Sequence, residues 1–173
     1  MTLPRPPRAA PLTTPAVLPG APVRHGWTLL AVPAFSEPHR ELLVEVRELK
    51  ARHPDGYLKR NVTKRLAAVQ KLILDDIPAD PTDPRFRLGG TLGPARRHWF
   101  RAKFLQQYRL FFRFDVPTRV IIYAWLNDEG TKRAYGSRTD AYEVFRKRLE
   151  AGDPPEDWDE LMRQARPAPS SAS

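Results

Sequence analysis

Hydrophobic residues recur at helical spacing in two segments of the N-terminal half. The first stripe is Leu42, Leu43, Val46 and Leu49, and it predicts a helix over residues 36–52 with Ser36 as its N-cap. The second stripe is Leu58, Val62, Leu66, Val69 and Ile73, and it predicts a helix over residues 57–76. Because only a short break separates them, we expect the two helices to pack as an antiparallel hairpin.

Strict alternation of side-chain types follows in three segments, residues 96–104, 107–114 and 119–126. Their connections are short, so they predict an antiparallel meander of three strands. An earlier apolar run at residues 27–32 predicts another short strand, and residues 77–95 are predicted to form a surface loop. Asp140 is expected to cap a third helix that ends near residue 150, and a last short helix is expected over residues 156–164.

Side chains alternate across a strand, so each strand of the meander has one apolar face that can cover the helix pair. The opposite faces combine cations and rings, and we expect them to share one surface: Trp99, Arg101, Lys103, Arg109, Phe111, Arg113, Tyr123 and Trp125. For Phe111, Ile121 and Trp125 a second interpretation stays open. The third helix could cover them and make a second small core, since large exposed apolar patches are uncommon.

The length of 173 residues predicts one domain, over residues 25–166. Residues 1–24 are rich in proline, residues 167–173 have low complexity, and both are predicted to be disordered. The absence of cysteine excludes disulfides, cysteine-based zinc sites and a thiol nucleophile. No apolar run approaches the ~20 residues that cross a bilayer, and the N-terminal segment lacks the apolar core of a signal peptide. The sequence therefore predicts a cytoplasmic protein without a membrane partner.

The chain carries 29 Lys and Arg against 20 Asp and Glu, a formal net charge of +9. The densest basic stretch is residues 96–113, which holds six Lys and Arg and no acidic residue. Such a cluster within strands favours an anionic partner. Cations that hold phosphates beside rings that stack on bases are typical of single-stranded nucleic-acid binding. The basic face of the second helix is expected to be solvated, although contact with RNA stays open.

Three segments resemble a known family: HWFRAKFLQQYRLFFRF, VIIYAWLNDEGTKRAYGSRTDAYEVFRKRL and GDPPEDW. They look like the YhaV family, the toxin halves of type II toxin–antitoxin pairs, and the resemblance spans about residues 26–165. The pattern RAK followed by YRLFF is more distantly similar to the RelE superfamily. This resemblance implies an α+β, RelE-like fold, in which an N-terminal helix hairpin packs on a small antiparallel sheet with C-terminal helices.

The resemblance also implies an endoribonuclease that cuts messenger RNA, inhibits translation and uses neither a metal nor another cofactor. Its motifs assign catalytic roles to Arg101, Lys103, Arg109, Arg133 and Tyr135. Contacts to RNA are expected from Arg97, Trp99, Phe111, Arg113, Lys132 and Arg138. Tyr135 could be the general base or could stack on a base, and Lys103 is the less favoured base. His98 is expected to be structural, and Asn127 and Asp128 are expected to fix the loop.

The expected partner is an antitoxin that is similar to PrlF, with an AbrB-type DNA-binding fold. The other expected partner is messenger RNA, and whether the ribosome takes part stays open. DNA contact is expected only through the antitoxin complex. A second hypothesis is a RelE-like module that binds RNA or a protein without cutting, since fold does not determine function. The basic cluster together with a proton-transfer group within reach favours the enzyme.

Overall fold

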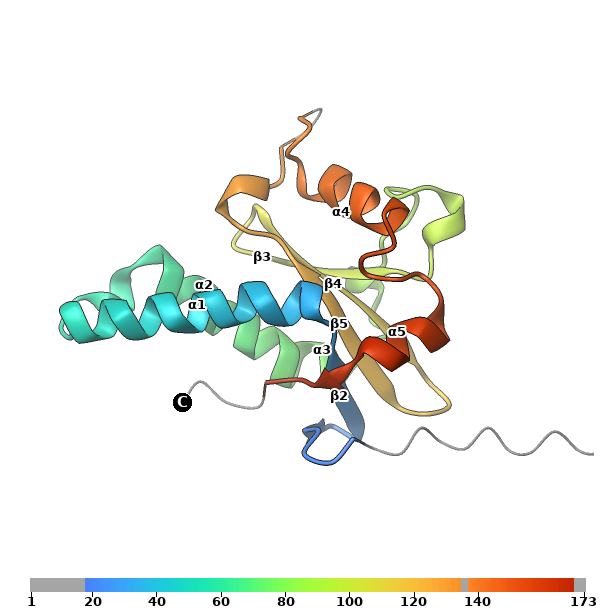
Figure 1. Cartoon of the computed structure of the whole chain (residues 1–173), viewed down its shortest axis with the longest axis horizontal. Helices are drawn as coiled ribbons and strands as arrows, with labels where there is room; N and C mark the ends of the chain where they lie inside the picture. Colours follow the sequence, from blue (N-terminus) through green and yellow to red (C-terminus); the bar gives the residue numbers. More distant parts are fainter. Residues whose placement is uncertain (1–17, 135–136, 170–173) are drawn as a thin grey trace, which may run out of the picture.

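A six-stranded sheet separates two layers of helices in the computed structural model, which describes residues 18–134 and 137–169 (Figure 1). The strands are β1 (Val23–Arg24), β2 (Trp27–Ala31), β3 (Phe100–Phe104), β4 (Tyr108–Asp115), β5 (Val120–Leu126) and β6 (Arg166–Pro167). Their order is β1-β2-β5-β4-β3, and β6 pairs with β2. β2 runs parallel to β5, whereas β3, β4 and β5 form an antiparallel meander, as the alternation predicts.

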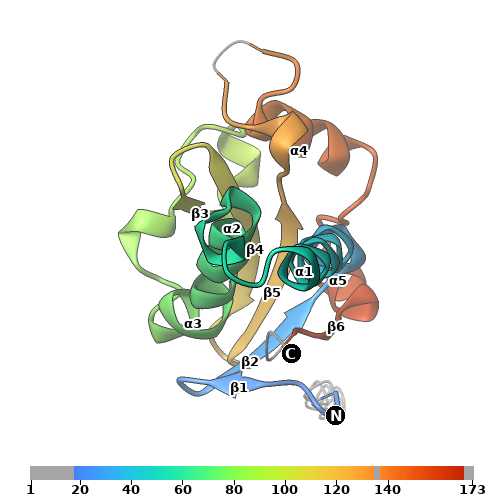
Figure 2. The ribbon, with the colours of Figure 1, turned by 90° about the vertical axis from the view of Figure 1, so that its left-hand side faces the viewer.

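The helices on one face are α1 (Pro33–Arg52), α2 (Asn61–Lys71) and α3 (Ile77–Ala79), with a π-helical turn at Leu72–Asp76 between the last two. Figure 2 shows α1 and α2 side by side in front of the sheet. The other face carries α4 (Ala141–Glu150) and α5 (Trp158–Gln164). Four short 3-10 turns complete the described elements: Tyr57–Lys59, Pro84–Phe86, Pro94–Arg96 and Glu129–Thr131. Within the described ranges, no helix is long and apolar enough to cross a membrane.

The boundaries differ from the predicted ones at the N-terminal helices. α1 begins at Pro33, so Ser36 lies inside the helix and is not its cap. Proline is well suited to the first helical position, because its fixed φ is already helical and its missing N–H has no partner there anyway. The predicted second helix is interrupted by a 3-10 turn, a break at Arg60 and the π-helical turn.

Two apolar cores lie on the two faces of the sheet. The core under α1–α3 contains Ala102 of β3 and Leu110 and Phe112 of β4, as the alternation predicts. The core under α4 and α5 contains Phe111 and Trp125, together with Phe145 of α4. All seven residues of β5 are buried, because both of its faces are covered. Of the two interpretations left open, the second small core is the one observed for Phe111 and Trp125.

Tyr123 lies on the helix-pair side of the sheet, so its expected place on the cationic surface is wrong. The register of β4 and β5 shifts between Phe111 and Phe112, which face Trp125 and Tyr123. This irregularity turns Tyr123 into the core under α1–α3, where its ring is fully buried. Its hydroxyl donates to the carbonyl of Ile73, 2.5 Å away in the π-helical turn, and burial raises its pKa well above the ordinary range.

The folded part of the chain extends beyond the predicted limits at both ends. Residues 18–24 were expected to be disordered, but Leu18 and Ala21 pack against the core under α4 and α5, and Val23–Arg24 form β1. At the other end, Arg166–Pro167 pair with Ala31 and Leu30 of β2. Backbone hydrogen bonds along an open sheet edge explain both extensions, because β2 would otherwise present unpaired groups there. Residues 1–17 and 170–173 of the two predicted tails lie outside the described residues.

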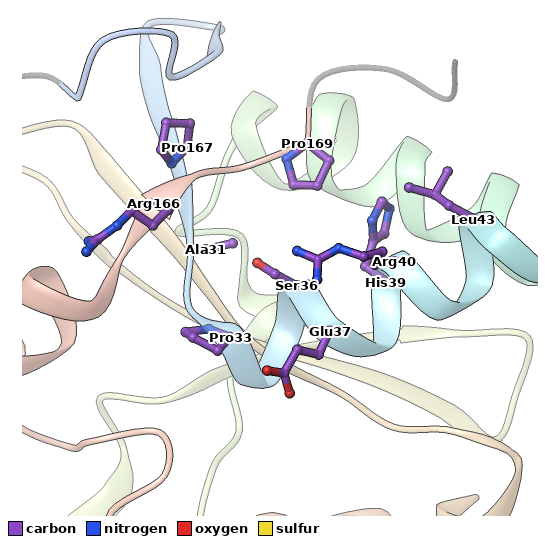
Figure 3. A pocket seen from close by; sticks show the side chains of 10 residues that line it. All are labelled: Ala31, Pro33, Ser36, Glu37, His39, Arg40, Leu43, Arg166, Pro167 and Pro169. Atoms are coloured by element: carbon purple, nitrogen blue, oxygen red, sulfur yellow. The ribbon is translucent and has the colours of Figure 1, made fainter.

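His39 on α1 is a buried titratable group beside a hollow of about 390 Å³ that the start of α1 and β6 enclose (Figure 3). Its ring stacks on Phe35 with 5.5 Å between centroids, and only 1% of the residue is exposed. Its buried Nε2 has no hydrogen-bond partner among the described residues. Burial lowers the pKa of His39 to about 4, because the imidazolium cannot be solvated there.

We expect His39 to make the protein less stable in mild acid. The unfolded chain binds a proton near the ordinary pKa of 6.5, whereas the folded chain does so only near 4. The free energy of unfolding should therefore fall between pH 7 and pH 4, by about 3 kcal/mol from this one residue. Urea unfolding across this range, compared between wild type and His39→Leu, measures the effect. Parallel pH profiles for the two proteins would contradict it.

Candidate functional site

Strands β3 and β4 bring three of the predicted catalytic cations together. The register sets Lys103 directly opposite Arg109, and Arg101 opposite Phe111. Arg101 and Lys103 are two residues apart on β3, so they share one face of the strand. That face is the one covered by α4, since both Arg101 and Arg109 contact Tyr142 of that helix. Lys103 is exposed, Arg101 is half-buried and Arg109 is buried.

The hydroxyl of Tyr142 connects these arginines. It accepts a hydrogen bond from Arg101 Nε at 2.9 Å and another from Arg109 Nε at 3.1 Å. The guanidinium of Arg133 lies over the Tyr142 ring, 4.7 Å from its centroid. Three of the predicted catalytic side chains therefore converge on one tyrosine, which holds two of them by its oxygen and the third by its π face.

Backbone carbonyls hold the same arginines in place. Arg109 Nη1 donates to the carbonyls of Gln106 and Tyr108 at 2.7 and 2.8 Å. Arg101 Nη1 donates to the carbonyl of Arg85 at 2.8 Å. Neutral carbonyls satisfy the donors of a guanidinium without cancelling its charge. Both groups are thus oriented by hydrogen bonds and remain available for electrostatic attraction to an anion.

Asp140 joins Arg133 to the helix that carries Tyr142. Its Oδ1 accepts from Arg133 Nη1, with which it forms an ion pair, and from the backbone N–H of Ala134 at 2.7 Å. Its Oδ2 accepts from the N–H of Tyr142 at 3.1 Å, which makes Asp140 the N-cap of α4, as the sequence predicts. One carboxylate therefore positions the loop arginine and starts the helix.

Asn127 fixes the loop that leads from β5 to Arg133. Its side-chain oxygen accepts from the N–H of Arg109 at 2.7 Å, and its amide donates to the carbonyls of Gln107 and Thr131. Asp128 and Thr131 form a reciprocal capping box around the following 3-10 turn. The prediction that Asn127 and Asp128 fix the loop is confirmed by these contacts.

The cationic cluster is the set Arg101, Lys103, Arg109 and Arg133. Asp140 is the one carboxylate that the described part of the chain pairs with a member of this cluster. Four positive charges with a single negative charge repel one another at short range, and the repulsion is strongest where water is excluded. An anion with several oxygens, such as a phosphate diester, would relieve this repulsion and match the planar guanidinium groups.

Trp99 and Phe111 are buried, so the prediction that they contact RNA is wrong for this conformation. Neither ring is exposed to solvent. Phe111 stacks on Phe145 of α4 with 4.0 Å between ring centroids, and Trp99 contacts the same ring edge-on at 5.2 Å. The apolar face of α4 covers them because it needs an apolar partner of its own.

Arg113 is also turned inward rather than toward a ligand. Its guanidinium lies between the rings of Trp99 and Trp158, 5.4 and 5.2 Å from their centroids. It donates to the carbonyl of Glu156 at 2.5 Å, and burial lowers its pKa. These contacts attach β4 to the segment before α5. These contacts give Arg113 a packing role, and its predicted contact with RNA stays a prediction.

The remaining predicted residues form no hydrogen bond or ion pair with the cluster in the described part of the chain. Arg97 and Arg138 are exposed and form no ion pair with any described residue. Lys132 pairs with Glu129 at 2.7 Å, on the far side of the loop from Arg133. Tyr135 lies outside the described residues, so its predicted role is not tested. His98 is exposed just before β3 and is not part of the cluster, and within the described ranges no three His, Asp or Glu gather as metal ligands.

Tyr142 is the site residue that the sequence analysis missed. It belongs to the segment VIIYAWLNDEGTKRAYGSRTDAYEVFRKRL, which carries the family resemblance, but the sequence analysis gives it no chemical role. A signal was present: Asp140 as N-cap places Tyr142 in the first helical turn, on the same face as Phe145. That face had to be buried against the sheet, and a buried tyrosine hydroxyl needs hydrogen-bond partners. The nearest donors on the sheet were the strand arginines.

Comparison with known proteins shows that the chain matches one family of toxins over most of its length. Residues 29–166 match the family model of YhaV toxins, described as toxins with endonuclease activity of a toxin–antitoxin system. The chain is 46% identical over 142 residues to the ribonuclease toxin YhaV of Escherichia coli K12. The matched region covers 81% of this chain and 92% of the relative. The toxin YhaV of Escherichia coli O157:H7 has the same identity and coverage. No solved structure matches the chain significantly.

Replacing Tyr142 by phenylalanine tests its hydroxyl as the group that orients the arginines. Tyr142→Phe keeps the ring under Arg133 but leaves Arg101 Nε and Arg109 Nε without their shared acceptor. We expect RNA cleavage to slow by at least about tenfold, with a loss of about 1–3 kcal/mol in the free energy of unfolding. Tyr57→Phe, at a half-exposed site on the 3-10 turn before α2, is the matched control. Cleavage by Tyr142→Phe at the wild-type rate would contradict this role.

Proposed function

Because this chain belongs to the YhaV family of toxins with endonuclease activity, we propose that it is an endoribonuclease that cuts messenger RNA. As the toxin of a toxin–antitoxin system, it has an antitoxin as its partner. The proposed chemistry is attack of the RNA's own 2′-hydroxyl on the adjacent phosphate, without a metal ion. The observation that carries this chemistry is the convergence of Arg101, Arg109 and Arg133 on Tyr142.

The transition state of this reaction is a phosphorane with two negative charges, so catalysis needs positive groups that are already in place. The guanidinium groups of Arg101 and Arg109 are held by Tyr142 and by backbone carbonyls before any substrate arrives. Their orientation therefore costs little when the charge develops. Lys103 stands opposite Arg109 and is exposed, which suits contact with a non-bridging phosphate oxygen.

The bond changes balance without a co-reactant. A general base takes the proton of the 2′-hydroxyl while the 2′-oxygen bonds to phosphorus. The bond from phosphorus to the 5′-oxygen then breaks, and a general acid protonates that oxygen. The products are a 2′,3′-cyclic phosphate and a 5′-hydroxyl. We assign the phosphate contacts to Arg101, Lys103, Arg109 and Arg133, and proton transfer to Tyr135 on the evidence of the sequence motif alone.

We further propose a RelE-like fold, a specific type of antitoxin partner and a site of action in the cell. The layered α/β arrangement with a three-stranded antiparallel meander supports a RelE-like fold. We propose a PrlF-like antitoxin with an AbrB-type DNA-binding fold, and DNA contact only through that complex. The site of action is the cytoplasm, where messenger RNA is translated. The exposed arginines Arg97 and Arg138 are proposed to add RNA contacts beside the cluster.

The first experiment is cleavage of a long RNA by purified protein in excess EDTA. We expect the wild type to cut and to leave 2′,3′-cyclic phosphate ends. Arg101→Ala should cut at least about 100-fold more slowly, because one preorganised donor to the developing charge is lost. Arg163→Ala, an equivalent change at an exposed arginine of α5, should cut like the wild type.

The alternative outcomes distinguish the hypotheses. Cleavage that stops in EDTA and returns with a divalent cation would contradict the metal-free mechanism. Equal cleavage by Arg101→Ala and wild type would show that the cationic cluster is not the active site. Tight RNA binding without cleavage, with and without ribosomes, would support the non-catalytic binding module.

A further inference from the structure

A second hollow lies beside the loop that carries Arg133, where the neighbouring Lys132 forms part of its lining. It has a volume of about 350 Å³ and is enclosed by the start of α2, the turn between β3 and β4, and the loop after β5. Its lining includes Asn61, Lys64, Arg65, Gln107, Tyr108 and Lys132. This volume lies within the range of about 300–1,000 Å³ that small-ligand pockets occupy, and it is large enough for one nucleotide.

One wall of this hollow is held together by ionic and aromatic contacts. Arg65 lies over the ring of Tyr108 at 4.5 Å, and the Tyr108 hydroxyl donates to Glu129. Lys132 pairs with Glu129 at 2.7 Å, and Arg65 Nη1 does so at 3.5 Å. The hydrogen bonds from Lys132 and Tyr108 lower the pKa of Glu129, so this carboxylate stays charged. These contacts join the residues of the wall, and its single carboxylate serves two cations.

Three other lining residues have polar side chains that form no hydrogen bond within the described part of the chain. Asn61, Lys64 and Gln107 are exposed, and none of their side-chain polar groups bonds to another described residue. Amide side chains donate and accept hydrogen bonds in the pattern that base edges require, and lysine contacts phosphate. Buried Arg65 Nε also has no hydrogen-bond partner within the described ranges. The hollow thus combines two amide side chains that can hydrogen-bond to the edge of a base, Asn61 and Gln107, with an excess of positive charge.

The loop after β5 connects this hollow to the cationic cluster. Lys132 lines the hollow, and its neighbour in the chain, Arg133, stacks on Tyr142 in the cluster. The backbone N–H of Arg133 donates at 2.9 Å to the carbonyl of Gln107, which also lines the hollow. A single strand of RNA that passes over this loop would meet both places.

We propose that this hollow is a specificity subsite that receives one unstacked nucleotide of the RNA, next to the phosphate held by the cationic cluster. Asn61 and Gln107 contact the edge of the base, whereas Lys64 and Lys132 contact its phosphate. The assignment of the bound molecule as RNA rests on the proposed function. The subsite would make the toxin prefer certain bases beside the bond that it cuts.

Binding of RNA that cannot be cut tests the subsite separately from cleavage. The probes are fluorescein-labelled 2′-O-methyl octanucleotides of uridine in which one central position is A, C, G or U. These RNAs lack the attacking hydroxyl, so fluorescence anisotropy gives Kd with the wild-type protein. The proteins are wild type, Asn61→Ala, Gln107→Ala, Lys64→Ala and a control, Gln164→Ala, whose exposed amide lies on α5.

We expect the wild type to prefer one central base by about tenfold, and Asn61→Ala and Gln107→Ala to lose most of that preference. Lys64→Ala should weaken binding of all four RNAs several-fold and about equally, since phosphate contacts carry no sequence information. Gln164→Ala should behave like the wild type. The proposal is overturned if the wild type binds all four RNAs equally, or if Asn61→Ala and Gln107→Ala both keep its preference. A wild type that shows this preference but cuts no RNA would overturn the proposed function and leave the subsite standing.

Discussion

The Tyr142 hydroxyl accepts hydrogen bonds from Arg101 Nε and Arg109 Nε, and this shared oxygen determines how the two strand arginines are oriented. Two guanidinium groups on neighbouring strands would otherwise move apart to reduce their repulsion. Holding them together requires an acceptor that does not neutralise them, and a tyrosine oxygen meets this requirement. A carboxylate in the same position would orient the arginines equally well, but it would also oppose the binding of a phosphate. The helix that delivers Tyr142 is therefore part of the site.

The position of α4 depends in turn on the second apolar core. Phe145 stacks on Phe111 and Trp125 and contacts Trp99, so aromatic packing fixes the helix over β4 and β5. The sequence suggested Trp99, Phe111 and Trp125 as groups that stack on RNA bases. In the structure they hold α4 in place instead, and the tyrosine of that helix orients the arginines. A large aromatic core is suited to this task, because close packing leaves little freedom for the helix to shift.

The sequence predicted the three strands of the meander, their order and the strand cations Arg101, Lys103 and Arg109, because alternation and charge are local properties of the chain. Arg133 was assigned to the site by the family resemblance. The sequence did not predict which rings would be buried. The pattern around Phe111 shows that two faces exist, but not what covers each of them. Tyr123 was misplaced for a different reason, since the register shift between β4 and β5 has no signal in the alternation. Tyr142 could have been found from the amphipathic stripe of its helix, and Tyr135 lies outside the described residues.

The loop from Asn127 to Arg133 explains how one short segment can serve two neighbouring sites. Asn127 is buried, and its hydrogen bonds attach the loop to the beginning of β4, at Gln107 and at Arg109. From this anchored backbone Lys132 and Arg133 reach opposite sides, each beside one carboxylate, Glu129 and Asp140. Both carboxylates hold their cations in position yet leave each site with excess positive charge. An RNA strand is a regular row of phosphates, and such a row matches two sites of the same sign better than any single anion does.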